Sequence, residues 1–118
     1  MYKRQVWECV DLFRLGPDSA AAPDVLLVSA WSEGVTHHGV YQTGRFDGER
    51  FRPAGKDHLD HGRRYFYAAQ SFADEQGRRV LFGWVPEGRP EPAQVAAGWS
   101  GVMSLPRQAT LTLSLIHI

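Results

Sequence analysis

The 118-residue chain is long enough for one small domain with a modest hydrophobic core. Its 13 basic and 13 acidic residues cancel, so it lacks the positive field by which proteins bind the phosphate backbone of nucleic acids, and we expect no nucleic-acid partner. One cysteine, Cys9, excludes an internal disulfide and a four-cysteine zinc site, and no apolar run reaches the roughly 20 residues that a membrane-spanning helix needs.

Extended segments separated by turn signals occupy the first half of the chain. Residues 25–30 form a short apolar run between turn-forming residues, which is typical of a buried strand. Asp47-Gly48 then separates residues 39–46 from residues 49–51. An Asp-Gly pair between extended segments indicates a hairpin, because both turn positions tolerate positive φ.

A second hairpin is predicted further along the chain. Residues 65–72 and 78–84 are its two arms, and residues 74–77 form the turn. The two hairpins are loosely similar, since each has an aromatic residue, a glutamine, a phenylalanine and then an acidic-glycine turn. Loose repetition on this scale favours propeller blades over a sandwich.

The last third of the chain has weaker signals. Residues 86–92 read as a Pro/Gly/Glu loop, residues 94–97 have room for one helical turn, and residues 101–105 return as a strand that Pro106 ends. We predict no helix of three turns. Short, regularly spaced strands with turns between them predict an all-β fold, either a sandwich, a barrel or a propeller.

Four stretches share their order and spacing with one enzyme family. They are Trp7-Glu8-Cys9-Val10-Asp11-Leu12-Phe13, Leu59-Asp60-His61-Gly62 continuing through residues 66–72, residues 77–84, and Gly98-Trp99-Ser100-Gly101 ending in residues 104–107. Together they resemble glycoside hydrolase family 32, the invertases, inulinases, levanases and sucrose-6-phosphate hydrolases. Val10 stands where the family usually has proline. Two family motifs do not occur here: an Asn-Asp-Pro-Asn stretch with the nucleophilic aspartate and an Arg-Asp-Pro stretch that binds the fructosyl hydroxyls.

The resemblance implies a fold, a reaction and a set of site residues. The fold is a five-bladed β-propeller, of which this chain supplies later blades. The reaction is cleavage of β-fructofuranosidic bonds in sucrose, sucrose 6-phosphate, inulin or levan, without a cofactor. The catalytic residue is Glu8, and the substrate-binding residues are Asp60, Arg63, Tyr67, Gln70 and Trp99.

Glu8 suits the chemistry of a retaining glycosidase. Such enzymes place two carboxyl groups about 5–5.5 Å apart, one as nucleophile and one as proton donor and later base. The donor must stay protonated near neutral pH, which burial or a neighbouring negative charge favours. The flanking Trp7 and Cys9 suit a partly desolvated carboxyl, whereas without the resemblance an exposed glutamate on a strand is the better explanation of Glu8.

Simpler roles are available for the remaining site residues. Asp60 and Arg63 also fit a surface turn with a local ion pair, worth at most about 1 kcal/mol. Tyr67 and Gln70 also fit the core of a blade, and Trp99 also fits packing after a glycine. These alternatives stay open from the sequence alone.

The histidines are not expected to bind a metal. His37 and His38 are adjacent on an extended segment and point to opposite faces, so they do not chelate together. His58 and His61 could chelate only in a tight turn with further ligands from elsewhere.

Both ends of the chain read as foreign sequence. Residues 113–118 match one frame of a transposase adapter used in library sequencing, and residues 1–5 match a frame of its reverse complement. We therefore expect residues 6–112 to be a partial catalytic propeller that is inactive alone, because the nucleophile lies upstream, and that aggregates through open strand edges. Localisation, oligomeric state and the particular fructoside stay undetermined.

Two alternatives to a fructoside hydrolase remain. A fructosyltransferase of the same family differs only in what accepts the fructosyl group. A non-catalytic propeller would bind sugars or protein partners without cleaving them.

Overall fold

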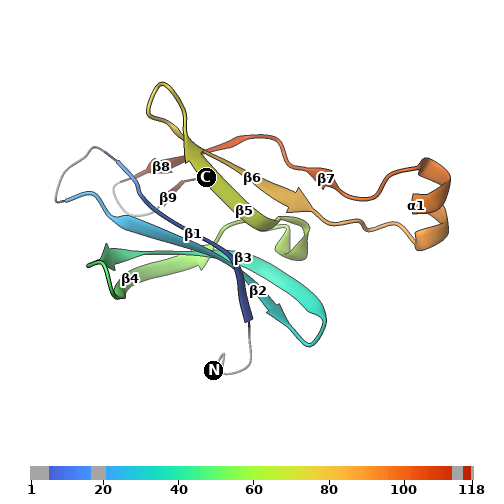
Figure 1. Cartoon of the computed structure of the whole chain (residues 1–118), viewed down its shortest axis with the longest axis horizontal. Coiled ribbons are helices and arrows are strands. Elements are labelled where there is room, and N and C mark those ends of the chain that lie inside the picture. The colour runs from blue at the N-terminus through green and yellow to red at the C-terminus, as the bar shows by residue number, and fades with distance from the viewer. Residues whose placement is uncertain (1–5, 17–20, 113–115, 118) are drawn as a thin grey trace.

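The computed structural model describes residues 6–16, 21–112 and 116–117, whose strands form two antiparallel sheets (Figure 1). The first sheet has the order β1-β2-β3-β4, formed by Val6–Arg14, Asp24–Ser32, Val35–Phe46 and Phe51–His58. The second has the order β5-β6-β8-β9, formed by Tyr67–Ala73, Arg79–Val85, Arg107–Leu111 and Ile116–His117, and β7 (Val102–Met103) also pairs with β6. A 3-10 turn, η1 (Arg63–Tyr65), joins the sheets, and a helix, α1 (Glu91–Ala97), follows β6. The expected foreign segments at residues 1–5, 113–115 and 118 lie outside the described residues.

The first predicted hairpin is confirmed and is longer than expected. β3 and β4 pair from Phe46↔Phe51 to Val40↔His58, so the second arm continues well beyond residue 51. Its turn spans four residues rather than two, because the Asp47 carboxylate accepts hydrogen bonds from the amides of Glu49 and Arg50 at 3.0 and 2.8 Å. β4 is the last strand of its sheet, and proline within a sheet is tolerated in such an edge strand, as at Pro53.

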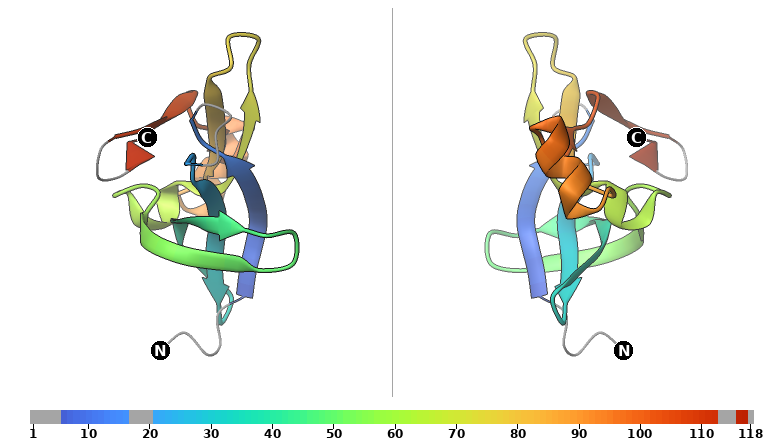
Figure 2. Two further views of the ribbon diagram at one scale, coloured as in Figure 1. Left: turned by 90° about the vertical axis from the view of Figure 1, so that its left-hand side faces the viewer. Right: turned by 90° about the vertical axis from the view of Figure 1, so that its right-hand side faces the viewer.

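The predicted second hairpin is confirmed as β5 and β6, which extend beyond the rest of the molecule (Figure 2). Its first arm begins at Tyr67, since Tyr65 lies in η1. The two hairpins are not equivalent units, because β3–β4 ends one sheet whereas β5–β6 begins the other. Their loose similarity is therefore no blade repeat.

The prediction for the C-terminal third is wrong in three respects. α1 begins at Glu91 and has seven residues rather than a single turn at residues 94–97. Pro92 lies in its first turn, where the missing N–H costs no hydrogen bond, and Gly98 ends the helix in the left-handed conformation at φ 73°. The expected strand at residues 101–105 is only two residues long, and β8 was not anticipated.

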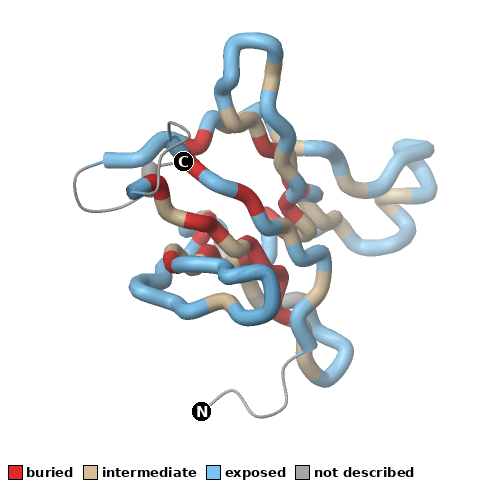
Figure 3. Tube along the Cα trace, turned by 60° about the vertical axis from the view of Figure 1, so that its left-hand side comes forward, coloured by how far each residue is buried: buried red, intermediate tan, exposed pale blue. Residues whose placement is uncertain are grey.

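The hydrophobic core lies between the two sheets (Figure 3). Val25 and Leu27 of β2 are at most 1 % exposed, as are Phe66 and Leu81 on the side of the second sheet. Full burial of each such side chain contributes about 1.5–3 kcal/mol. The Phe66 ring lies directly over Gly83, where an added Cβ would come within 2.7 Å of the ring. This packing fixes how the edge strands β1 and β5 meet.

Candidate active site

β1 and β5 each carry a β-bulge where the two sheets meet. The register of β1 shifts between Glu8 and Asp11, and that of β5 shifts between Tyr67 and Gln70. In each bulge the residue after the predicted site residue is left-handed: Cys9 has φ 49° and Ala68 has φ 53°. Such a conformation costs a residue with a side chain about 1–2 kcal/mol, and it concentrates at functional sites. We call residues 8–11 and 67–71 the β1–β5 seam.

Glu8 and Tyr67 meet across this seam. The Tyr67 hydroxyl donates a hydrogen bond to Oε2 of Glu8 at 2.7 Å. Tyr67 is 4 % exposed, and burial, together with the hydrogen bond and the charge of Glu8, raises the pKa of its phenol well above the usual range. Tyr67 therefore stays protonated and remains a donor to Glu8 throughout the working pH range.

Further polar contacts fix the two bulges against each other. The Gln70 side chain donates to the backbone carbonyl of Cys9 at 2.9 Å. The Ala68 amide donates to Oγ of Ser29, the residue paired with Glu8 in the sheet, at 2.9 Å. With the tyrosine contact, these bonds join β5 to Glu8, to its chain neighbour Cys9 and to its strand partner Ser29.

Asp11 and Ser29 also contact β5 at the seam, and the sequence did not single them out. Oδ2 of Asp11 accepts hydrogen bonds from the amide of Ser71, at 2.8 Å, and from the Ser71 hydroxyl. The position of Asp11 three residues after Glu8 was the available signal. Ser29 lies in an apolar run and gave none.

Asp60 and its surroundings form a separate cluster. Oδ2 of Asp60 accepts a hydrogen bond from Arg107 at 2.6 Å, and the Arg107 guanidinium lies 4.0 Å over the Phe66 ring. Among the described residues, no hydrogen bond or ion pair joins Asp60 to Glu8. Arg63 lies in η1, and its side chain is outside the described part of the structure.

Trp99 follows the cap residue of α1, and Figure 1 shows α1 beyond the ends of β6 and β7. Its side chain is half exposed, and one face of its ring is covered by Arg89, whose guanidinium lies 3.9 Å from the ring centre. The predicted site residues thus divide into three places: the seam, the Asp60 cluster and the Trp99 loop.

A cavity of about 310 Å³ lies on the first sheet. It is lined by Trp7, Ala30, His38, Val40, Gln42, Lys56, Asp57 and His58. His38 meets His58 edge-on, with ring centres 4.6 Å apart, a pairing that the sequence did not indicate. Within the described ranges, no three His, Cys, Asp or Glu residues gather as metal ligands, and no helix is long and apolar enough to cross a bilayer.

The arrangement of sheets matches solved carbohydrate-active enzymes. One is fructan 1-exohydrolase IIa of Cichorium intybus in complex with 1-kestose, with a TM-score of 0.73 and 28 % identity, over 90 % of this chain and 23 % of that chain. The chain is therefore all-β and forms part of a β-propeller.

The family model for the glycosyl hydrolases family 32 N-terminal domain matches residues 2–117, and the chain belongs to this family. Fructan 6-exohydrolase of Beta vulgaris is 38 % identical over 92 % of this chain and 20 % of its own length. Sucrose:sucrose 1-fructosyltransferase of Festuca arundinacea is 32 % identical over 90 % of this chain and 18 % of its own length. The chain thus spans about a fifth of the length of the curated relatives it matches.

Proposed function

We propose that the longer protein to which this chain belongs hydrolyses β-fructofuranosidic bonds with retention of configuration, and that Glu8 is its general acid and base. The observation that carries the proposal is the 2.7 Å hydrogen bond from Tyr67 to Glu8, made where two bulged strands meet. The phenol orients the carboxyl group and stabilises the carboxylate that remains once the proton has been given away, and the left-handed Cys9 and Ala68 mark a strained backbone of the kind that concentrates at functional sites.

Tyr67 decides which oxygen of Glu8 handles the proton. Because the phenol donates to Oε2, the transferable proton resides on Oε1. In the first step Oε1 gives this proton to the leaving sugar oxygen, while a second carboxylate attacks the anomeric carbon. In the second step Glu8 takes a proton from water, which then hydrolyses the fructosyl intermediate.

The remaining predicted residues would bind the sugar. The carboxylate of Asp60 suits paired sugar hydroxyls, with Arg107 orienting it and Arg63 on the same turn. Gln70 would fix the seam beside the reacting bond. Trp99 offers an aromatic face for stacking. The crystallised relative that holds 1-kestose supports a fructose-containing oligosaccharide as the ligand class.

This chain alone should be inactive. By resemblance, the nucleophilic aspartate belongs to an upstream segment, so one of the two required carboxyl groups would be absent. Sequencing the source DNA outward across Val6 and Thr112 tests directly whether the nucleophile lies upstream. Native sequence that contains an Asn-Asp-Pro-Asn stretch upstream is the expected result, and a genuine start at residue 1 without that stretch would contradict it.

A fructosyltransferase is the second candidate, favoured by the similarity to the enzyme from Festuca arundinacea. Both reactions share the fructosyl intermediate and differ only in the acceptor, water or another sugar. Incubating the full-length protein with concentrated sucrose separates the two. Free fructose equal to the glucose released indicates hydrolysis, whereas a trisaccharide with excess glucose indicates transfer.

The test of Glu8 is its replacement in the full-length protein. Glu8→Ala should reduce release of fructose from sucrose or 1-kestose by roughly 10²–10⁴-fold, the usual contribution of a general acid and base. Glu49→Ala, in the exposed turn between β3 and β4, is the matched control and should keep full activity. A wild-type protein that binds these sugars without cleaving them would identify the non-catalytic propeller instead.

A further inference from the structure

The loop around α1 is held by polar contacts rather than by apolar packing. No residue of α1 is buried, and Val95 at its centre is 74 % exposed. A helix of seven residues is also too short to be stable alone. The position of Trp99, which follows this helix directly, must therefore be set by the side chains around it.

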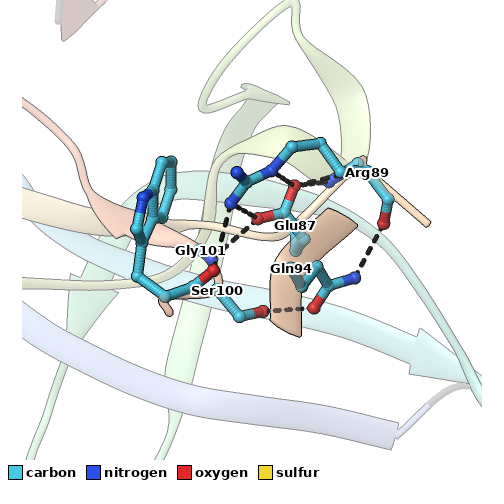
Figure 4. Close-up of polar contacts among 7 residues, drawn as sticks. Glu87, Arg89, Gln94, Ser100 and Gly101 are labelled. Carbon is cyan, nitrogen blue, oxygen red and sulfur yellow. Dashed lines mark hydrogen bonds and ion pairs between the residues drawn. The ribbon is translucent and has the colours of Figure 1, made fainter. Parts of the chain in front are cut away.

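Glu87 and Arg89 form the centre of these contacts (Figure 4). Nε and Nη2 of Arg89 donate to the two carboxylate oxygens of Glu87 at 3.0 and 2.6 Å, a bidentate pair. The carboxylate also accepts the amides of Gly88, Arg89 and Gly101, at 2.8, 2.7 and 3.3 Å. These donors, with Arg89 the strongest, lower the pKa of Glu87 to about 2, so the pair stays charged at working pH.

The same guanidinium holds Trp99 by two contacts. Nη2 of Arg89 donates to the Trp99 carbonyl at 3.1 Å, and Cζ of the guanidinium lies over the indole, 3.9 Å from the ring centre. Arg89 precedes α1 and Trp99 follows it, so Arg89 bridges the two ends of the helix. Gln94 supports the same bridge, because its amide donates to the Arg89 carbonyl and accepts from the Ser100 hydroxyl, each at 2.7 Å.

We propose that Glu87 and Arg89 are positioning residues that hold the Trp99 ring as a fixed stacking surface for a sugar unit of the substrate. Arg89 covers one face of the indole, and Trp99 remains 53 % exposed, which leaves ring surface for a ligand. Arg89 therefore affects substrate binding indirectly, by holding the Trp99 ring in place. The inference rests on the proposed function, because it assigns a sugar to Trp99.

The test uses the full-length protein and a double-mutant cycle. Arg89→Gln should raise KM for 1-kestose roughly two- to five-fold, as expected for loss of an exposed cation–π contact, with kcat unchanged. Arg89→Lys should not restore the wild-type KM, since an ammonium provides neither the bidentate fork nor the planar stack. In a Trp99→Ala background, Arg89→Gln should have no further effect on KM. An equal rise in KM in both backgrounds, or no rise in either, would overturn the proposal.

A matched control separates positioning from stability. Arg78→Gln removes a comparable ion pair, Arg78–Asp74 at 2.6 Å in the β5–β6 turn, which has no tryptophan beside it. Arg78→Gln should lower the thermal midpoint about as much as Arg89→Gln does, but it should leave KM unchanged. If it raises KM as much as Arg89→Gln does, the change in KM is a general effect of lost stability and the inference is wrong.

A second readout does not depend on catalysis. Arg89→Gln should increase acrylamide quenching of the Trp99 fluorescence, obtained by subtracting the signal of the Trp99→Phe variant. Increased quenching without any cleavage by the wild-type protein would refute the proposed function but leave Arg89 as the residue that holds Trp99. Unchanged quenching would refute the positioning role itself.

Discussion

The Tyr67 hydroxyl lies 2.7 Å from Oε2 of Glu8, although the two residues are 59 positions apart in the chain. Each belongs to a bulged edge strand, and each is followed by a left-handed residue, Cys9 or Ala68. In each strand the bulge follows the residue that makes the contact and interrupts the regular alternation of side chains between the two faces.

Removing the tyrosine hydroxyl should reduce turnover without unfolding the protein. Tyr67→Phe keeps the buried ring but leaves Oε2 of Glu8 without this donor. We expect kcat to fall about ten-fold in the full-length protein, corresponding to one hydrogen bond to a charged group. The control is Tyr65→Phe, which should keep wild-type kcat. It removes an exposed hydroxyl that accepts a hydrogen bond only from the Arg64 side chain among the described contacts. Equal kcat values for both variants would argue against a role for Tyr67.

Asp24 should make stability depend on pH in the acid range. It is 6 % exposed, and its pKa is lowered chiefly by the Phe46 amide, at 2.7 Å, and by Arg14, although burial opposes them. A carboxyl whose pKa is lower in the folded state stabilises fully above its unfolded pKa of about 3.9, and this contribution is lost as pH falls through the folded value.

Asp24→Asn should therefore lower the free energy of unfolding at pH 7 by about 2 kcal/mol and flatten its dependence on pH below 4. Urea titrations of the full-length protein at several pH values between 7 and 3 measure both effects. A variant that keeps the wild-type slope below pH 4 would show that other carboxylates cause the acid sensitivity.

Gly83 should tolerate no side chain. An added Cβ would lie 2.7 Å from two atoms of the Phe66 ring, which is fully buried and cannot move aside. We expect Gly83→Ala to destabilise the protein by about 1–3 kcal/mol, as overpacking does in other cores. At Gly88 the nearest atom to an added Cβ is 3.6 Å away, so Gly88→Ala should leave the urea midpoint nearly unchanged. Similar midpoints for both variants would contradict the packing described between the sheets.

The isolated chain should associate. Two large apolar side chains of β1 face solvent: Trp7 is 52 % exposed and Leu12 is 39 % exposed. Among the described strands, the edge strands β1 and β4 of this sheet have a neighbouring strand on one side only. Light scattering of the purified chain should show concentration-dependent aggregates. A monomer that melts sharply would refute this expectation.

The sequence predicted the elements whose signals are local. The apolar run in β2 and the acidic-glycine turns of both hairpins each depend on a few neighbouring residues, and all three elements are confirmed. α1 is longer than the predicted turn because Pro90 and Pro92, which on their own suggest a loop, stand at its start, where proline is favourable.

The site was only partly predictable, because its geometry depends on contacts between distant strands. Motif resemblance selected Glu8, Tyr67 and Gln70, which the seam brings together. No sequence signal indicated that Asp60 pairs with Arg107 or that Trp99 stacks on Arg89, since these partners come from separate strands and loops.

The most direct test of the account compares two substrates with the Glu8→Ala variant of the full-length protein. The leaving oxygen of sucrose needs a proton, whereas the fluoride of β-fructofuranosyl fluoride leaves without one. If Glu8 is the acid and base, the variant should lose roughly 10²–10⁴-fold on sucrose. It should still release fluoride, and added azide should trap the fructosyl group as the β-azide. An equal loss on both substrates, or full activity on sucrose, would contradict the assignment of Glu8.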